Sequence, residues 1–239
     1  MKYFLAILLL ISCLSCDKMT VRFSRSYVLS FNESDNIKLY NVSKAPVYML
    51  RVELINGKRI CSILSKGDEK ELFEKMGNKY GDNTYNREVR FIVNTLRNYI
   101  SDDITSVSIF SDKNFDNLHP ANTNLNDIVE LIYWSPLKYI QSGYKNLYNW
   151  GACQTLTQQE KDILHISYGI NEFHLEQVKA DEVVKSHLSL VGNGLYFPQI
   201  YLKFRKMPEL DKEHTFKIDV TTEAGNVMTG EIKISFEQL

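Results

Sequence analysis

Side chains that could act as nucleophiles or acid–base catalysts are present, but their spacing matches no catalytic motif. The chain contains no Gly-x-Ser-x-Gly sequence, which would hold a nucleophilic serine on a strained turn. Cys61 and Cys153 lie outside the N-terminal segment, and we expect them to form a disulfide or to be buried as small apolar residues. The acidic pair Asp102-Asp103 precedes a predicted strand and is typical of a solvated turn. We therefore predict no catalytic residue and expect the protein not to be an enzyme.

Residues that bind metals or phosphates are scattered along the chain. A zinc site needs close pairs such as Cys-x-x-Cys or His-Glu-x-x-His, and the only such spacing here, Cys13 to Cys16, follows an apolar N-terminal run. Gly192-Asn193-Gly194 lacks the third glycine of a dinucleotide-binding loop. The sequence therefore predicts no metal and no cofactor. We expect ordinary surface or core positions for the five histidines, His119, His165, His174, His187 and His214.

Aromatic residues are the most distinctive feature of the composition, with 14 Tyr, 12 Phe and 2 Trp. Tyr and Phe favour strands, so packing within sheets is one interpretation. The other is a surface that stacks against a sugar or holds a partner, because Tyr and Trp combine an apolar ring with a polar atom. The residues of this candidate aromatic surface are Trp134, Tyr144, Tyr148 and Trp150.

Residues 1–16 have the order of an export signal. Lys2 supplies a positive charge, and eight apolar residues follow from Phe4 to Ile11. This run is shorter than the roughly 20 residues of a membrane-spanning helix. Leu10-Ile11-Ser12-Cys13 resembles the bacterial lipobox, in which the cysteine receives a lipid and the preceding peptide is removed. We predict Cys13 as the lipid anchor.

Two other interpretations of this segment remain open. Lipidation of Cys16 would remove Cys13 with the leader and leave an even pair of cysteines, Cys61 and Cys153, suited to an oxidising compartment. Alternatively, an ordinary secretory peptide could be cut near Ser15. With a lipid anchor, each buried methylene would contribute about 0.8 kcal/mol to membrane attachment.

Length and charge point to one globular domain after this segment. The chain has 239 residues, 28 Lys and Arg, and 29 Asp and Glu. This balance provides no basic surface for nucleic acid and no general attraction to an anionic membrane. The composition, 44% hydrophobic and 24% charged, is typical of soluble globular proteins. We expect a signal peptide with its anchor cysteine at residues 1–16 and a single β-rich domain at residues 17–239.

Alternation of apolar and polar residues predicts several strands. It is strongest at residues 216–221 and 231–236, on either side of a turn containing Gly225, and predicts an antiparallel hairpin. Asn56-Gly57 predicts a second hairpin with a return strand at residues 58–64. Further strands are expected at residues 48–54, 104–110 and 200–205.

Helical spacing occurs only in short pieces. Apolar residues at 125, 128, 129 and 132 predict a helix behind Asn124, and Thr157 to Glu160 has the spacing of a capping box. Weaker helical patterns lie at residues 69–76 and 181–190. Strands separated by turns, with short helices between them, indicate a mainly β fold. We expect an antiparallel two-sheet β-sandwich, immunoglobulin-like, with short inserted helices.

Three sequence features together resemble a known family. They are the lipobox-like Cys13 and Cys16, Asp103-Ile104-Thr105-Ser106-Val107 leading to Asn124-Leu125-Asn126-Asp127, and His214-Thr215-Phe216-Lys217-Ile218-Asp219-Val220 with Gly225 in the following turn. This combination resembles small cell-envelope lipoproteins of Bacteroidetes that have no assigned function. The resemblance implies an exported, mainly β lipoprotein without known catalytic residues.

From these observations we expect a lipid-anchored protein of the bacterial outer membrane, on its periplasmic or its surface face, that is a non-catalytic binding or assembly module. The expected partners are the membrane, through the lipid, and an envelope protein or glycan, but not nucleic acid. One alternative is a hydrolase with an unfamiliar carboxylate site, which would place two acidic side chains in one pocket and raise the pKa of one. Another is a carrier of an apolar ligand, which would need an enclosed apolar cavity.

Overall fold

The computed structural model describes residues 20–55, 57–61, 66–91, 98–149, 155–164, 170–180, 182 and 199–236. Over these residues the chain is mainly β, with short helices between strands, which confirms the predicted fold class. None of the helices within these ranges is long and apolar enough to cross a membrane. Several predictions lie outside the described residues: the lipid anchor at Cys13 or Cys16, the aromatic Trp150, Cys153, and the helix at 181–190 apart from Glu182.

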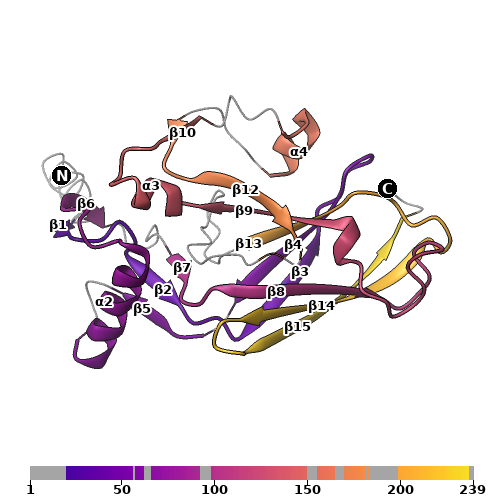
Figure 1. The fold of residues 1–239 in the computed structure, drawn as a ribbon, viewed down its shortest axis with the longest axis horizontal. Helices are drawn as coiled ribbons and strands as arrows, with labels where there is room; N and C mark the ends of the chain where they lie inside the picture. Colours follow the sequence, from indigo (N-terminus) through magenta and orange to yellow (C-terminus); the bar gives the residue numbers. More distant parts are fainter. Residues whose placement is uncertain are drawn as a thin grey trace, which may run out of the picture.

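Two antiparallel sheets form the body of the molecule (Figure 1). The order across the larger sheet is β12 (His174–Lys179), β9 (Val129–Ser135), β13 (Gln199–Phe204), β4 (Tyr48–Ile55) and β3 (Asn36–Asn41). The smaller sheet has the order β15 (Val227–Ser235), β14 (Glu213–Thr222) and β8 (Ile104–Ser111). These strands confirm the predicted C-terminal hairpin and the strands expected at 48–54, 104–110 and 200–205.

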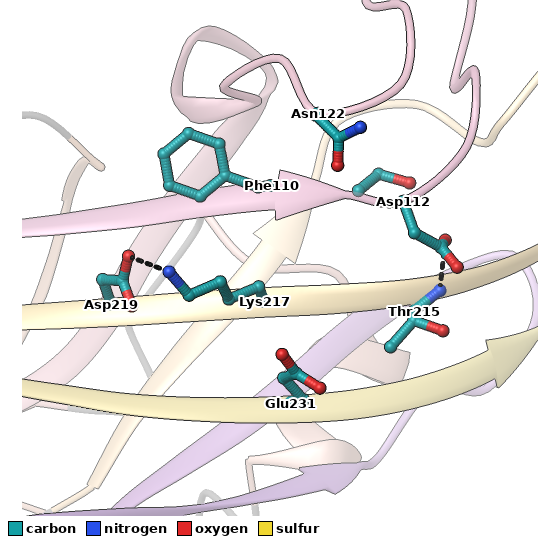
Figure 2. Close-up of a pocket in the computed structure, with 8 residues that line it drawn as sticks. Phe110, Asp112, Asn122, Thr215, Lys217, Asp219 and Glu231 are labelled. Atoms are coloured by element: carbon teal, nitrogen blue, oxygen red, sulfur yellow. Dashed lines mark hydrogen bonds and ion pairs between the residues drawn. The ribbon is translucent and has the colours of Figure 1, made fainter.

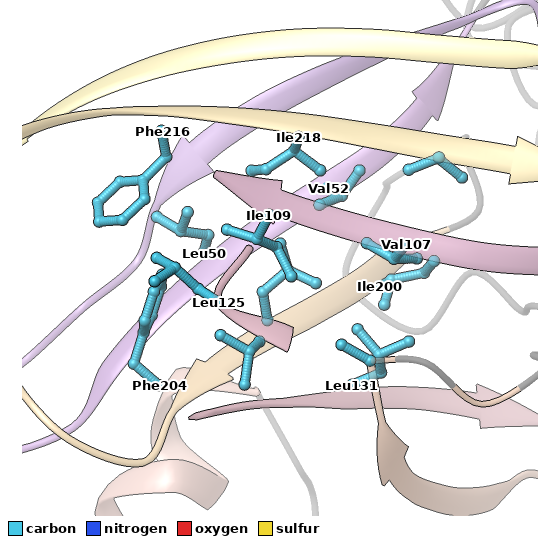
Figure 3. Packing of buried hydrophobic residues seen from close by; sticks show 14 of the residues in the cluster. Leu50, Val52, Val107, Ile109, Leu125, Leu131, Ile200, Phe204, Phe216 and Ile218 are labelled. Carbon is cyan, nitrogen blue, oxygen red and sulfur yellow. The ribbon is translucent and has the colours of Figure 1, made fainter. Parts of the chain in front are cut away.

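The main hydrophobic core lies between these two sheets (Figure 3). Alternate residues of each strand point into it, such as Leu50 and Val52 of β4, and Ile218 of β14, so the period of two in the sequence becomes the inner face of a sandwich. At one side β15 lies against β3, since a Cβ atom on Gly230 would come 3.1 Å from side-chain atoms of Ile37 and Leu39. A glycine there allows the two sheets to meet.

A second, smaller core lies beside the sandwich. Its sheet has the order β5 (Arg59–Cys61), β2 (Ser30–Asn32) and β7 (Asn98–Ile100), with β2 and β7 parallel. Buried aromatic and apolar residues of this sheet pack with α2 (Asp68–Tyr80) and α3 (Leu137–Gln141). For example, the rings of Phe31 and Phe73 lie 5.4 Å apart. Helix α2 confirms the helical pattern predicted at 69–76.

A third apolar layer covers the outer face of the larger sheet. Ile163 and Leu164, at the end of α4 (Gln158–Ile163), belong to a buried cluster with Met49 and Trp134 of the sheet. The capping box predicted for this helix is confirmed, because Thr157 and Glu160 each bond the other's backbone amide. Two small antiparallel ribbons complete the described structure, β1 (Thr20–Ser24) with β6 (Arg87–Phe91), and β10 (Tyr148–Asn149) with β11 (Ile170–Asn171).

Two predicted elements are wrong. Residues 125–132 form one turn of 3₁₀ helix, η1 (Asn126–Ile128), followed by strand β9. Strand β9 is buried on both faces, so its apolar residues do not alternate with polar ones and their spacing fits a helix by chance. The chain does turn at Gly57, but β5 pairs with β2 and not with β4. Gly57 has φ +90°, and a Cβ atom there would overlap the carbonyl oxygen of Glu33 at 1.3 Å.

Candidate functional site

Two of the four residues of the predicted aromatic surface are buried, and Trp150 lies outside the described residues. Trp134 is only 1% exposed and packs edge-on against Tyr201, with ring centroids 5.5 Å apart. Tyr144 is 6% exposed, and its hydroxyl donates a hydrogen bond to Asp82. Tyr148 is half-buried beside His174. The binding-surface interpretation is therefore wrong for Trp134 and Tyr144, whose rings pack in the interior.

Of the cysteines, only Cys61 is placed by the described structure. It lies in β5 and pairs with Ser30 of β2. Because Cys153 falls outside the described residues, the Cys61–Cys153 disulfide stays a prediction.

The three histidines within the described ranges are buried and hydrogen-bonded. His174 bonds the backbone oxygen of Asn146, and His119 lies between the carboxylates of Asp116 and Asp127. His165 and His187 fall outside the described residues. No group of three or more His, Cys, Asp or Glu in the described part of the chain could hold a metal ion.

One serine–histidine pair has the contact that nucleophilic catalysis requires. Ser111 Oγ lies 2.6 Å from Nδ1 of His214, whose Nε2 donates to the backbone oxygen of Asp211. Both side chains are at most 2% exposed, in the core beside Phe216. The Ser111 oxygen also accepts from the backbone amide of Lys113. This geometry joins β8 to β14 and offers no access to a substrate.

A shallow polar groove lies on the outer face of the smaller sheet (Figure 2). Its charged groups largely satisfy one another. Lys217 pairs with Asp219 at 3.1 Å, and Asp112 accepts the backbone N–H of Thr215 at 2.7 Å. Burial opposes ionisation of Asp112, but the hydrogen bonds from Thr215 outweigh it and hold the pKa of that carboxyl below its usual range. The groove is also lined by Asn122 and by the exposed carboxylate of Glu231.

A second groove, which we call the α2 groove, has both apolar and charged lining residues. It lies between α2, the turn before β8 and the turn joining β14 to β15, and has a volume of about 440 Å³. Leu72 and Met76, one helical turn apart, supply apolar lining, and Lys75 and Lys79 follow them by three residues each. The remaining lining residues are Glu33, Ser101, Asp102, Glu223 and Ala224.

Lys79 organises the charges of the α2 groove. Its ammonium pairs with Glu223 and lies 3.2 Å from Asp103, which also accepts a hydrogen bond from the hydroxyl of Tyr80. Burial disfavours the ammonium, but the hydrogen bonds with Glu223, Tyr80 and Asp103 outweigh it and raise the pKa of Lys79 above its usual range. The Asp103 side chain is only 15% exposed, so the expectation of a solvated turn is wrong at this residue.

Asp102 and Ser101 differ from the other polar groups of the α2 groove. Burial raises the pKa of the Asp102 carboxyl; Lys79 lowers it, and the neighbouring carboxylates of Glu223 and Asp103 raise it further. Ser101 is 7% exposed, and its hydroxyl has no hydrogen-bond partner among the described residues. A buried hydroxyl without a partner costs about 1–3 kcal/mol. An ordered water, an ion or a ligand group would satisfy such a hydroxyl.

The sequence could not identify the α2 groove as a site. Its lining comes from four segments, near residues 33, 72–79, 101–102 and 223–224, which only the folded chain brings together. Of these residues, only Asp102 stands in a pattern with possible chemistry, the acidic pair before a strand. The groove thus has an apolar wall, two lysines and three acidic lining residues, of which Asp102 has a raised pKa.

Comparison with known proteins adds no family to this description. No protein-family model, no curated protein and no solved structure matches the chain.

Proposed function

We propose that this chain is an exported, lipid-anchored protein of the bacterial cell envelope and a non-catalytic binding or assembly module, with the α2 groove as its binding site. The apolar leader and the lipobox-like residues before Cys13 support export and anchoring. The observation that carries the binding function is the α2 groove itself, where Asp102 has a raised pKa and the Ser101 hydroxyl has no partner among the described residues.

The charges of the α2 groove favour a cationic ligand. The groove is lined by two lysines of α2, and four carboxyl groups lie in or beside it, those of Glu33, Asp102, Glu223 and the adjacent Asp103. Lys79 already pairs with two of these carboxylates, so negative charge is left over near Asp102. Burial is the largest cause of the raised Asp102 pKa, and repulsion from Glu223 and Asp103 adds to it; a cation bound there would relieve that repulsion.

The apolar wall of the groove suggests which cation would fit. Leu72 and Met76 could contact the methylene stem of a lysine or arginine side chain while its charged end reaches the carboxylates. The proposed ligand is therefore a basic segment of another envelope protein.

Titration with short peptides tests this proposal. NMR or calorimetry would measure the affinity of the protein, purified after export, for the peptides Gly-Lys-Gly, Gly-Arg-Gly and Gly-Glu-Gly. We expect binding of the two basic peptides only, and an affinity at least tenfold lower for Asp102→Asn, because a hydrogen bond to a charged group contributes about 1.5–3 kcal/mol. Glu231→Gln is the matched control, since Glu231 is an exposed carboxylate in the other groove. Equal affinity of Asp102→Asn and the unchanged chain would contradict the proposal.

The pH dependence of binding gives a second test of the same site. The cation binds the ionised form of Asp102, whose pKa is raised. Affinity should therefore weaken as the pH falls through that raised pKa, and this pH dependence should be reduced in Asp102→Asn.

A carboxylate hydrolase is the second candidate function. It is favoured by the raised pKa of Asp102 beside Glu223, because a general acid needs a raised pKa near a second carboxyl group. Turnover of glycan or ester substrates that is lost in Asp102→Asn would replace the binding function with this one. For the third interpretation, a carrier of apolar ligands, the described residues give no specific support; buried side chains of both sheets lie in the space between the sheets (Figure 3).

A further inference from the structure

The ribbon formed by β1 and β6 lies where the described chain begins. Thr20 pairs with Phe91 and Ser24 with Arg87, and neither strand joins another described sheet. In Figure 1 the ribbon is at the opposite end of the molecule from the loop that follows β8. The ribbon is therefore the first described element after the predicted anchor cysteine.

The exposed side chains of the ribbon and its flanks combine an aromatic ring with positive charge. Phe23 is 66% exposed, the highest value among the large aromatic residues of the described chain. Arg25 and Arg87 are also exposed, and the guanidinium of Arg87 lies 5.1 Å from the centre of the Tyr85 ring. Residues 20–25 and 87–91 contain four arginines and one acidic residue, Glu88, although the whole chain has a net charge of -1. Positive charge is thus concentrated at this ribbon.

The distance from the predicted anchor to the ribbon is short. Thr20 follows Cys16 by four residues and Cys13 by seven. A fully extended chain covers at most about 3.6 Å per residue, which gives about 14 Å from Cys16 or about 25 Å from Cys13. Because electrostatic attraction to a membrane extends about 8–10 Å at physiological salt, a lipid on either cysteine would keep the ribbon within easy reach of the headgroups.

We propose that the β1–β6 ribbon is a second membrane contact, which docks on an anionic phospholipid surface with Phe23 in the headgroup region. The proposal rests on the lipid anchor of the proposed function. An aromatic ring is suited to the membrane interface, and each arginine near an anionic surface favours the docked state roughly fivefold. One lipid anchor leaves the domain free to rotate, whereas this second contact would fix its orientation.

Quenching of tryptophan fluorescence by brominated phosphatidylglycerol tests the docking. The exported Phe23→Trp chain would be reconstituted in vesicles of phosphatidylethanolamine and brominated phosphatidylglycerol. Leu118→Trp is the matched control, since Leu118 is 81% exposed and lies in the loop after β8. The native tryptophans contribute equally to both variants. We expect several-fold stronger quenching in Phe23→Trp than in Leu118→Trp.

Variants that remove positive charge distinguish docking on anionic lipid from simple proximity to the bilayer. Adding Arg25→Gln and Arg87→Gln to the Phe23→Trp chain should lower the ratio of docked to undocked molecules by roughly 30-fold. Lys113→Gln, at an exposed cation in the loop after β8, is the control and should change nothing. Quenching of Phe23→Trp that is no stronger than that of Leu118→Trp would overturn the proposal. So would quenching that stays the same when the two arginines are replaced and when brominated phosphatidylcholine takes the place of brominated phosphatidylglycerol.

Mass spectrometry of the same preparations shows whether the chain is acylated and so tests the lipid anchor separately from the docking of the ribbon. An acylated chain whose Phe23→Trp variant is not quenched would retain the anchor and reject the docking surface. A chain that is not acylated but shows headgroup-dependent quenching would reject the anchor and retain the docking surface.

Discussion

Asp82 is a completely buried carboxylate that joins distant parts of the chain. It accepts hydrogen bonds from the backbone amides of Tyr27 and Val28, at 2.7 and 2.8 Å, and from the hydroxyl of Tyr144. Burial and the adjacent Asp82 carboxylate raise the pKa of Tyr144 to about 12, which keeps its hydroxyl a donor. Asp82 thereby fixes the end of α2 to the segment before β2.

Asp82→Asn should lower the free energy of unfolding by about 2–4 kcal/mol. The amide has one oxygen for two backbone N–H groups, so its own NH₂ would face a donor. Urea unfolding followed by circular dichroism measures the effect. Asp35→Asn, at an exposed aspartate, is the matched control and should change stability by less than about 0.5 kcal/mol. Equal stability of the two variants would contradict the role assigned to Asp82.

Asp116 should make stability depend on pH. Burial opposes its ionisation, but hydrogen bonds from Lys206, His119 and the backbone amide of Leu118 outweigh burial and hold the Asp116 pKa well below its usual range. Since the folded-state pKa lies below the unfolded value of about 3.9, the stabilisation is complete above the unfolded pKa and is lost as the pH falls below it.

Asp116→Asn isolates this contribution. At pH 7 the substitution should lower the free energy of unfolding by about 3 kcal/mol, because it leaves the ammonium of Lys206 without its buried partner. As the pH falls from 5 to 3, the difference between the two chains should shrink. Urea unfolding at several pH values measures it. Curves that stay parallel over this range would show that Asp116 is not the group responsible.

The exposure of single residues was the least predictable property. Trp134 lies on the outer face of the larger sheet, which in most sandwiches faces solvent, but α4 and its neighbours cover that face. The sequence shows which residues alternate along a strand, but not what covers each face of a sheet. For the same reason the sequence could not show that Asp102 has a raised pKa, because its neighbour Glu223 is distant in sequence.

Elements were predictable where the pattern and the tertiary environment agree. One face of the hairpin formed by β14 and β15 is exposed to solvent, so apolar and polar residues alternate clearly along its strands. The capping box of α4 depends only on residues that are close in sequence. Strand β9 was misread as a helix because it is buried on both faces. The turn at Gly57 was predicted correctly, but the pairing of the strand that follows it was not. The glycine there permits the chain to pass close to Glu33, and β5 then pairs with β2.

Thr157→Ala tests the capping box of α4. Loss of the bond between the threonine oxygen and the Glu160 amide should lower the free energy of unfolding by about 1 kcal/mol, and amides of α4 should exchange faster with deuterium. Thr157→Ser, which keeps the oxygen, is the control and should behave like the unchanged chain. If Thr157→Ser and Thr157→Ala lost the same stability, the hydroxyl would not be the important group.

At the scale of the whole molecule, the chain passes repeatedly between the sandwich and the smaller core. It forms β2 in the smaller core, β3 and β4 in the sandwich, and then β5, α2 and β7 back in the smaller core before β8 returns to the sandwich. Neither core is made from one continuous segment. The two cores should therefore form one cooperative unit, as expected of a single domain.

Phe73→Ala tests this cooperativity. Phe73 is 5% exposed on α2 and packs against Phe31 in the smaller core, so its truncation should cost about 3–5 kcal/mol. In a single unit, the fluorescence of a Trp150→Phe background, which reports Trp134 on the larger sheet, and circular dichroism should move together to lower urea as one transition. Leu118→Ala, at an exposed leucine, is the control and should shift neither signal. An early transition in circular dichroism, with the fluorescence transition unmoved, would instead identify the smaller core as a separate folding unit.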